Sequence, residues 1–187
     1  MIDGAKTAPF YGGKMQNILE VDIKGYKAEL PVLPLPSGVK IAFFNLHGNT
    51  KMTKHCADEL AKLLDGCEVL LTAESKGLQL THCIADKLGQ DFYAVARMQD
   101  GISVTISSSI TTGREQRLYL SKHDAELLRG KKVGIVDDVV STGNSLEGLE
   151  KLVAMCGGSV FKKAFVLAEG NAAERKDIIY LAKIPLL

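Results

Sequence analysis

Hydrophobic and polar positions along this chain follow two periods, one typical of strands and the other of helices. Apolar segments predict buried strands at residues 39–44, 68–73, 92–96, 133–136, 164–168 and, more weakly, 178–181. Apolar side chains recur at helical spacing in residues 52–64, 78–88 and 145–156. Strands that alternate with helices indicate right-handed βαβ units, so we expect an α/β fold with a mostly parallel twisted sheet flanked by helices.

Two segments depart from this pattern. Ile102, Val104 and Ile106 alternate with polar residues, and a turn at 111–113 leads to a second extended run at 118–120, which predicts a projecting β-hairpin. A short helix capped by His123 or Asp124 should follow over residues 124–129.

Prolines mark the N-terminal segment. Pro31, Pro34 and Pro36 interrupt an apolar run, which therefore favours an edge strand over a central one. We expect residues 1–37 to form a cap outside the main sheet.

Composition restricts the classes of partner. The chain has 187 residues, 46% of them hydrophobic, which suits one well-buried domain. With 23 basic and 22 acidic residues the net charge is +1, so we expect neither a nucleic-acid nor a membrane partner.

Residues 1–13 lack the pattern of an export signal, and we expect a cytoplasmic protein. Neither the cysteines nor the histidines show metal-site spacing, and we expect reduced, packed cysteines at positions 56, 67, 83 and 156.

The most informative segment follows the strand at 133–136. Asp137 and Asp138 come first, then a loop of small and hydroxylated residues, then the helix at 145–156. Free backbone N–H groups at a helix N-terminus bind phosphate, and small side chains let it approach. Paired carboxylates accept hydrogen bonds from vicinal hydroxyls. A phosphorylated ribose fits both halves of this segment.

Residues 133–145 resemble the signature of the type I phosphoribosyltransferases, which bind phosphoribosyl pyrophosphate (PRPP). An apolar strand, an acid pair, a Thr-Gly loop and a helix occur in the same order. The alternative is an ordinary strand-to-helix turn with solvated aspartates. The resemblance implies a single domain over 1–187, with a core at 38–170 and a small hood built from residues 1–37 and 171–187.

A second resemblance lies one βα unit upstream. Glu74, Ser75, Lys76 and Gly77 are similar to the Glu-Ser/Ala-Arg-Gly turn that binds pyrophosphate in adenine and xanthine enzymes, although a solvated turn is the alternative. Lys76 keeps the charge of the arginine but lacks its planar fork. Arg97 stands where related enzymes carry an Arg-Lys pair, which implies a contact to pyrophosphate or across a dimer, or else a solvated side chain.

The hairpin corresponds in position to the mobile catalytic loop of the family. Arg114 and Arg117 are its candidate catalytic residues, or simply its exposed face, and the Tyr-x-Leu-Glu-Tyr-Gly sequence of adenine enzymes is absent. Residues 166–170 resemble the Val-Ile-Glu segment of adenine and xanthine enzymes, so Glu169 and Val139 are the candidate base contacts.

The resemblance implies transfer of a phosphoribosyl group from PRPP to a purine, adenine being favoured, with release of pyrophosphate in nucleotide salvage. Asp137 and Asp138 would hold the ribose hydroxyls, and pyrophosphate would lie against residues 74–77 and Arg97. Mg²⁺ would arrive on PRPP, near the acid pair and without direct protein ligands, and the protein would be a homodimer. The 5′-phosphate would lie on Ser141, Thr142, Gly143, Asn144 and Ser145.

Three alternatives concern the acceptor base, catalysis itself and the class of enzyme. The acceptor could be xanthine, hypoxanthine or guanine, because the hood that reads the base is where the similarity ends. The chain could also be a PRPP sensor without catalysis. A different nucleotide-sugar enzyme is disfavoured because neither GxxxxGK[ST] nor GxGxxG occurs.

Overall fold

Five parallel strands form the central sheet. The structure is a computed structural model that describes residues 17–35, 38–98, 104–109 and 115–187. The strand order is β10-β9-β8-β4-β5, and every neighbouring pair is parallel, as the alternating pattern predicts. These strands are β4 (Val69–Ala73), β5 (Ala94–Ala96), β8 (Lys132–Val140), β9 (Ser159–Glu169) and β10 (Ile179–Ile184).

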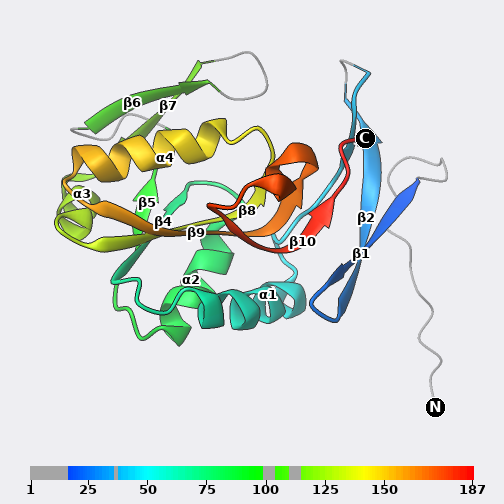
Figure 1. Cartoon of the computed structure of the whole chain (residues 1–187), viewed down its shortest axis with the longest axis horizontal. Coiled ribbons are helices and arrows are strands. Elements are labelled where there is room, and N and C mark those ends of the chain that lie inside the picture. The colour runs from blue at the N-terminus through cyan, green and yellow to red at the C-terminus, as the bar shows by residue number, and fades with distance from the viewer. Residues whose placement is uncertain (1–16, 36–37, 99–103, 110–114) are drawn as a thin grey trace.

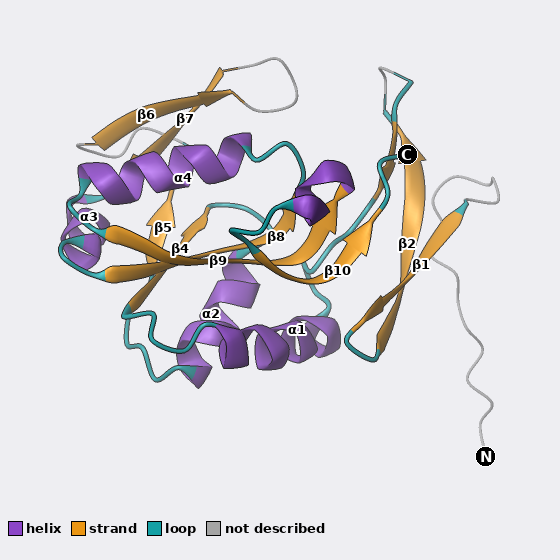
Figure 2. Cartoon of the chain, viewed as in Figure 1, coloured by secondary structure: helices purple, strands orange, loops and turns teal. Residues whose placement is uncertain are grey.

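Helices cover both faces of this sheet, in three layers that are clear in Figure 2. Helices α1 (Thr50–Leu63) and α2 (Leu78–Lys87) pack on one face. Helices α3 (Lys122–Leu128) and α4 (Asn144–Met155) pack on the other (Figure 1). The chain leaves β4 through α2 toward β5 and leaves β8 through α4 toward β9, so the winding direction reverses between β4 and β8. Ligands of such sheets bind where the winding reverses.

The N-terminal segment forms a separate antiparallel sheet. Strands β1 (Ile18–Ile23), β2 (Tyr26–Pro34) and β3 (Lys40–Ala42) lie in the order β1-β2-β3. The run at 39–44, which the alternation assigned to the main sheet, thus contributes β3 to this small sheet instead. The prediction that the proline-rich run would avoid a central position was also wrong.

Pairing along β2 explains how a central strand tolerates prolines. Its residues 26–31 pair only with β1, and its residues 32–34 pair only with β3. The two pairings meet at residues 31–32, where the Val32 N–H donates to the Asn17 carbonyl and the Phe43 N–H donates to the Pro31 carbonyl. Pro31, which lacks an N–H, thus takes part there as an acceptor, and Pro34 lies in the half that pairs with β3 alone among the described strands.

The C-terminal strand belongs to the central sheet. β10 pairs in parallel with β9, whereas the sequence grouped residues 171–187 with the hood. β10 lies beside β1, and residues of both strands line a shallow groove between the two sheets. A 3₁₀ turn, η1 (Gly170–Glu174), connects β9 to the segment before β10.

The two strands of the predicted hairpin are confirmed, whereas Ile102 and the predicted turn at 111–113 lie outside the described residues. Strands β6 (Val104–Ser109) and β7 (Glu115–Leu120) pair antiparallel, and α4 lies between this hairpin and the central sheet (Figure 1). The helix after the hairpin begins earlier than predicted. Its N-cap is Ser121, whose Oγ accepts a hydrogen bond from the Asp124 N–H at 3.1 Å, so neither His123 nor Asp124 caps it.

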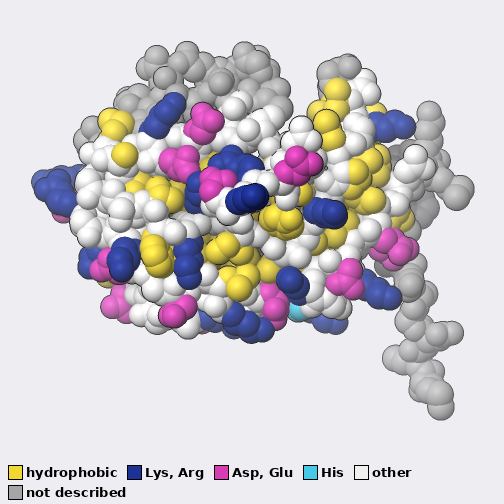
Figure 3. Space-filling view, in the orientation of Figure 1, with side chains coloured by type: hydrophobic (Ala, Val, Ile, Leu, Met, Phe, Trp, Pro, Cys, Tyr) yellow, Lys and Arg dark blue, Asp and Glu magenta, His cyan; other side chains and the backbone are white. Residues whose placement is uncertain are grey.

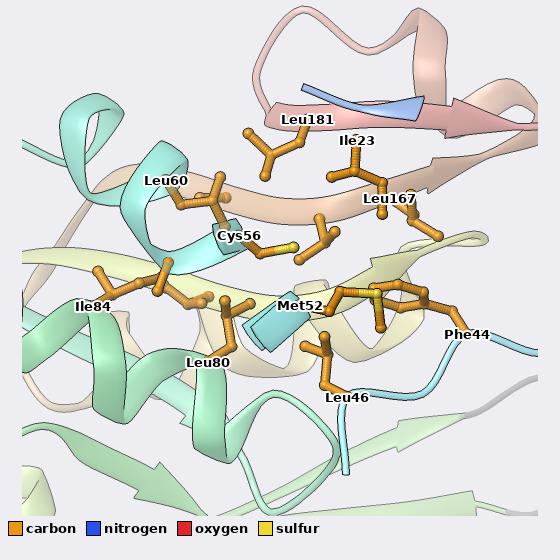
Figure 4. Close-up of a cluster of buried hydrophobic side chains, with 14 of the residues drawn as sticks. Ile23, Phe44, Leu46, Met52, Cys56, Leu60, Leu80, Ile84, Leu167 and Leu181 are labelled. Carbon is orange, nitrogen blue, oxygen red and sulfur yellow. The ribbon is translucent and has the colours of Figure 1, made fainter. Parts of the chain in front are cut away.

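The core has one apolar cluster on each face of the sheet. Figure 4 shows the cluster under α1 and α2, to which β1 contributes Ile23, α1 contributes Leu60 and β10 contributes Leu181. His55 of α1 also makes a 2.7 Å hydrogen bond to the Ile23 carbonyl. The N-terminal sheet is thus held to the core through the end of β1. All four cysteines are free, and within the described residues no helix is long and apolar enough to cross a membrane.

Replacing Ile23 by alanine should loosen the N-terminal sheet. Because the Ile23 side chain is fully buried, Ile23→Ala should lower the free energy of unfolding by about 2–4 kcal/mol. Ile18→Ala, on the exposed part of the same strand, should change it by about 0.5 kcal/mol or less. Denaturant titration measures both, and equal losses from the two variants would contradict this anchoring role.

Candidate functional site

Two loops meet at the carboxyl edge of β4 and β8. These strands are neighbours, with Leu71 opposite Ile135, so Ala73 and Asp137 end up at the same level. The turn 74–77 follows β4 and opens α2, and the loop 141–145 follows β8 and opens α4. Both predicted anion-binding loops therefore lie next to the acid pair.

The loop 141–145 presents unused backbone donors. Gly143 has a φ of 85°, a left-handed conformation that suits glycine, and it occupies the N-cap of α4 without any side-chain cap. By contrast, α1 and α3 are capped by Asn49 and Ser121. A pocket of about 120 Å³ lies inside the loop and reaches Asp137 and Phe165. The first turn of α4 therefore keeps its N–H groups for an anion.

The turn 74–77 is bonded directly to the acid pair. Ser75 Oγ donates to Asp137 Oδ1 at 3.0 Å and accepts from the Gly77 N–H at 3.2 Å. A Cβ on Gly77 would lie 2.6 Å from Asp137 Oδ1 and 2.9 Å from Thr72 Oγ1, so only glycine fits. Helix α2 begins at Gly77, again without a side-chain cap. Within this turn the N–H groups of Glu74 and Ser75 are bonded to the Ala96 and Ala73 carbonyls, so the turn combines close contact to Asp137 with the N–H groups of the first turn of α2, which no side chain caps.

Asp137 is held in an unfavourable place for a charge. Burial, and then repulsion from Asp138, raise the pKa of Asp137 to about 7. Hydrogen bonds from the Asp138 N–H at 2.9 Å and from Ser75 act in the opposite direction. Strongly displaced pKa values of this kind concentrate at functional sites.

Asp138 is paired with Lys76. Its side chain is buried, and Asp138 Oδ2 lies 3.0 Å from Lys76 Nζ. The two atoms are close but not aligned as a hydrogen bond, and Oδ2 has no hydrogen-bond partner within the described part of the chain. Lys76 Nζ instead donates to the Phe44 carbonyl at 2.7 Å and lies 5.5 Å from the centre of the Phe43 ring. Because Oδ2 is buried, the contact with Lys76 is what balances its charge among the described residues.

The remaining predicted residues lie at the same edge or outside the described structure. Glu74 is exposed, and the exposed Arg97 pairs through its backbone with Tyr119 of β7. Val139 is half-buried beside the loop, and Glu169 ends β9, where Ala168 is opposite Val140. Arg114 lies outside the described residues, and Arg117 is placed only as a backbone position in β7.

Sequence reasoning missed three residues of this region. Phe43 and Phe44 position Lys76, one through its ring and the other through its carbonyl. Arg175 reaches the loop at Gly143 from the segment after η1. No local pattern marks them, because each acts across a distance in sequence that only the fold closes.

A second hollow is larger but holds none of the predicted site residues. It measures about 450 Å³ and lies between the starts of α1 and α2, where Asn49, Leu78 and Tyr93 are among its lining residues. Its walls are mainly apolar, and Lys54 and His82 are its basic lining residues, with no carboxylate among them to bind sugar hydroxyls. The acid pair and its two loops remain the candidate site.

Comparison with known proteins identifies the domain family of this chain. Residues 45–184 match the phosphoribosyl transferase domain. An adenine phosphoribosyltransferase of Thermotoga maritima is 29% identical over 165 residues, which cover 86% of this chain and 94% of that protein. One from Butyrivibrio fibrisolvens is 26% identical over 160 residues, covering 84% of this chain and 88% of that protein.

Solved structures agree on the fold. The adenine phosphoribosyltransferase of Thermoanaerobacter pseudethanolicus is 25% identical with a TM-score of 0.67, covering 83% of this chain and 95% of that one. The Giardia lamblia enzyme complexed with 9-deazaadenine has the same TM-score at 15% identity, covering 83% and 93%. The domain match spans most of the chain and includes both loops and the acid pair. The chain belongs to the phosphoribosyl transferase domain family.

Proposed function

We propose that this protein transfers the phosphoribosyl group of PRPP to adenine and releases pyrophosphate. The observation that carries the proposal is the acid pair between two uncapped helix starts on neighbouring strands. A ring with hydroxyls, a phosphate on one side and a pyrophosphate on the other matches that arrangement. The relatives named above are adenine phosphoribosyltransferases, which favours adenine as the acceptor.

Binding and orientation are the main tasks of the chain in this reaction. The 5′-phosphate would lie on Ser141, Thr142, Gly143, Asn144 and Ser145. A nitrogen of adenine forms a bond to the ribose C1 as the bond from C1 to the pyrophosphate oxygen breaks; the bonding electrons leave with pyrophosphate, which can also take the proton that this nitrogen loses. Asp137 and Asp138 hold the ribose hydroxyls and stabilise the positive charge that develops on the ring.

Pyrophosphate would leave against the turn 74–77. The N–H groups in the first turn of α2, which has no side-chain cap, would face the pyrophosphate, and Lys76 and Arg97 would supply positive charge. Val139 and Glu169 lie at the same strand edge and would contact the base. The arginines of the hairpin, Arg114 and Arg117, would cover the reacting ring and exclude water.

Magnesium fits this donor set. Mg²⁺ prefers oxygen ligands and keeps several waters, and the carboxylates of Asp137 and Asp138 supply such oxygens beside the place of pyrophosphate. No group of three or more potential metal-ligating side chains occurs among the described residues. The ion would thus enter with PRPP, neutralise its pyrophosphate and face the acid pair. A homodimer is a further prediction, which light scattering tests.

The proposed reaction is tested with a panel of bases. Protein, Mg²⁺ and PRPP are incubated separately with adenine, hypoxanthine, guanine, xanthine, orotate and uracil, and pyrophosphate is measured. We expect release with adenine at a rate at least about tenfold above that with any other base, because a mispaired polar edge is costly. Pyrophosphate release with a different base, and none with adenine, would overturn the assignment of adenine as the acceptor. Tight PRPP binding without release from any base would favour the sensor.

The sensor is the second candidate because Lys76 is bonded within the site. Its Nζ is occupied by Asp138 and the Phe44 carbonyl, so pyrophosphate would have to compete with both. A protein that binds PRPP without turnover could keep Lys76 there permanently.

Removing both carboxylates should abolish the reaction without unfolding the protein. We expect Asp137→Asn combined with Asp138→Asn to lower kcat/KM for PRPP by about a thousandfold or more, because the developing positive charge loses its partners. The matched control changes the exposed Asp86 and Asp91 to asparagine and should keep full activity. Pyrophosphate release at the wild-type rate by the first variant would refute the assignment.

The ionised carboxylate of Asp137 should lower the free energy of unfolding. Because the folded protein raises the pKa of Asp137 from 3.8 to about 7, the folded state holds a proton that the unfolded chain loses, and the free energy of unfolding falls as pH rises between these values. Asp137→Asn should therefore be more stable than the wild type by about 1–2 kcal/mol at pH 8 and no more stable at pH 4. Urea titrations at both pH values test this, and a variant less stable at pH 8 would contradict it.

Lys76 should act through its charge. Lys76→Met removes the cation that faces Asp138, and we expect the KM for PRPP to rise about tenfold. Lys76→Arg should stay within about threefold of the wild type, since the charge is kept. Lys122→Met, which removes an exposed lysine at the start of α3, is the control. Equal KM values for the wild type and Lys76→Met would show that Lys76 does not meet PRPP.

A further inference from the structure

Arg175 lies against the backbone of the loop 141–145. A Cβ built on Gly143 would stand 2.8 Å from Arg175 Nη1, so the guanidinium touches this loop at its left-handed residue. Arg175 follows η1, and its backbone N–H donates to the Ala172 carbonyl at 3.2 Å. It is not among the residues that line the pocket inside the loop. The side chain therefore supports Gly143 from behind.

One carboxylate fixes the guanidinium. Arg175 Nε donates to Asp177 Oδ1 at 3.0 Å, and Nη2 donates to Asp177 Oδ2 at 2.8 Å. This two-point bond occupies one edge of the planar group. Nη1, the nitrogen at Gly143, makes no hydrogen bond within the described ranges and belongs to the other edge. Asp177 thus orients Arg175 with its free N–H groups toward the loop.

Further ion pairs tie this arrangement to α4. Asp177 also binds Lys163 of β9, and Lys163 Nζ donates to Glu150 of α4 at 2.8 Å. The Lys163 side chain is only 13% exposed, so this part of the network is shielded from solvent. Basic and acidic side chains gather on this face over α4 and η1 (Figure 3). The loop is therefore supported by the same helix that it opens and by the strand beside it.

We propose that Arg175 is a positioning residue for the 5′-phosphate: held by Asp177, it locks Gly143 in its left-handed conformation and adds a fixed positive charge behind the loop. This inference rests on the proposed function, in which residues 141–145 bind that phosphate. A solvated surface arginine would have no reason to be fixed at two points with its third nitrogen on the loop. The charge acts on a bound phosphate through the thin layer of loop backbone.

Binding of AMP and adenosine separates this role from general stability. By calorimetry, Arg175→Met should bind AMP about tenfold more weakly than the wild type, because one nearby charge is lost, while adenosine binding changes by about twofold or less. The KM for PRPP should rise by a similar factor, with kcat nearly unchanged. Arg175→Lys should recover part of the AMP affinity. Asp177→Asn, which frees the guanidinium, should weaken AMP binding by about threefold.

Arg129→Met is the matched control, since Arg129 is an exposed arginine at the end of α3 and should bind both ligands like the wild type. Thermal unfolding of each variant identifies any loss of fold. Equal losses for AMP and adenosine, or no loss in Arg175→Met, would overturn the inference. If no base supports pyrophosphate release, the proposed reaction fails, yet an AMP-specific loss would still support Arg175. If the wild-type protein binds AMP no better than adenosine, the proposed role of Arg175 in phosphate binding is overturned.

Discussion

Two consecutive carboxylates at the end of β8 are the constraint on which this site depends. Burial and mutual repulsion raise the pKa of Asp137 to about 7, so the surrounding groups have to stabilise the pair. Ser75 donates to Asp137, and Lys76 faces Asp138 at 3.0 Å. Gly77 lets the turn approach closely enough to provide both contacts. The turn proposed for pyrophosphate is therefore also what keeps the acid pair in place.

Topology explains why these groups meet at all. The turn 74–77 and the acid pair are about sixty residues apart in sequence, yet β4 and β8 are neighbours in the sheet. The winding reverses between them, so α2 and α4 leave from the same edge toward opposite faces. Each helix starts without a side-chain cap, and each start adjoins the acid pair. The proposed anion-binding positions on either side of one ring depend on that geometry.

Local patterns were enough to predict most elements and to select the acid pair and the two loops that the structure brings together. Strand β8, which carries Asp137, the loop 141–145 and α4 form one continuous sequence segment, so their order can be read from the residues. Strand pairing that depends on distant partners could not be predicted in this way. β2 lies in the centre of its sheet because its halves pair on opposite sides, and β10 joins the central sheet. The contact of Arg175 with Gly143 escaped for the same reason, since residues 175 and 143 approach only in the folded chain.

The central claim is that one pocket holds a ribose ring by its hydroxyls and by its 5′-phosphate. A crystal structure of the protein with PRPP and Mg²⁺ tests it most directly. The account predicts the 5′-phosphate on the backbone N–H groups of residues 141–145 and the ribose hydroxyls within hydrogen-bond distance of Asp137 and Asp138. Density for the pyrophosphate in that loop, or a ribose turned away from both carboxylates, would contradict it.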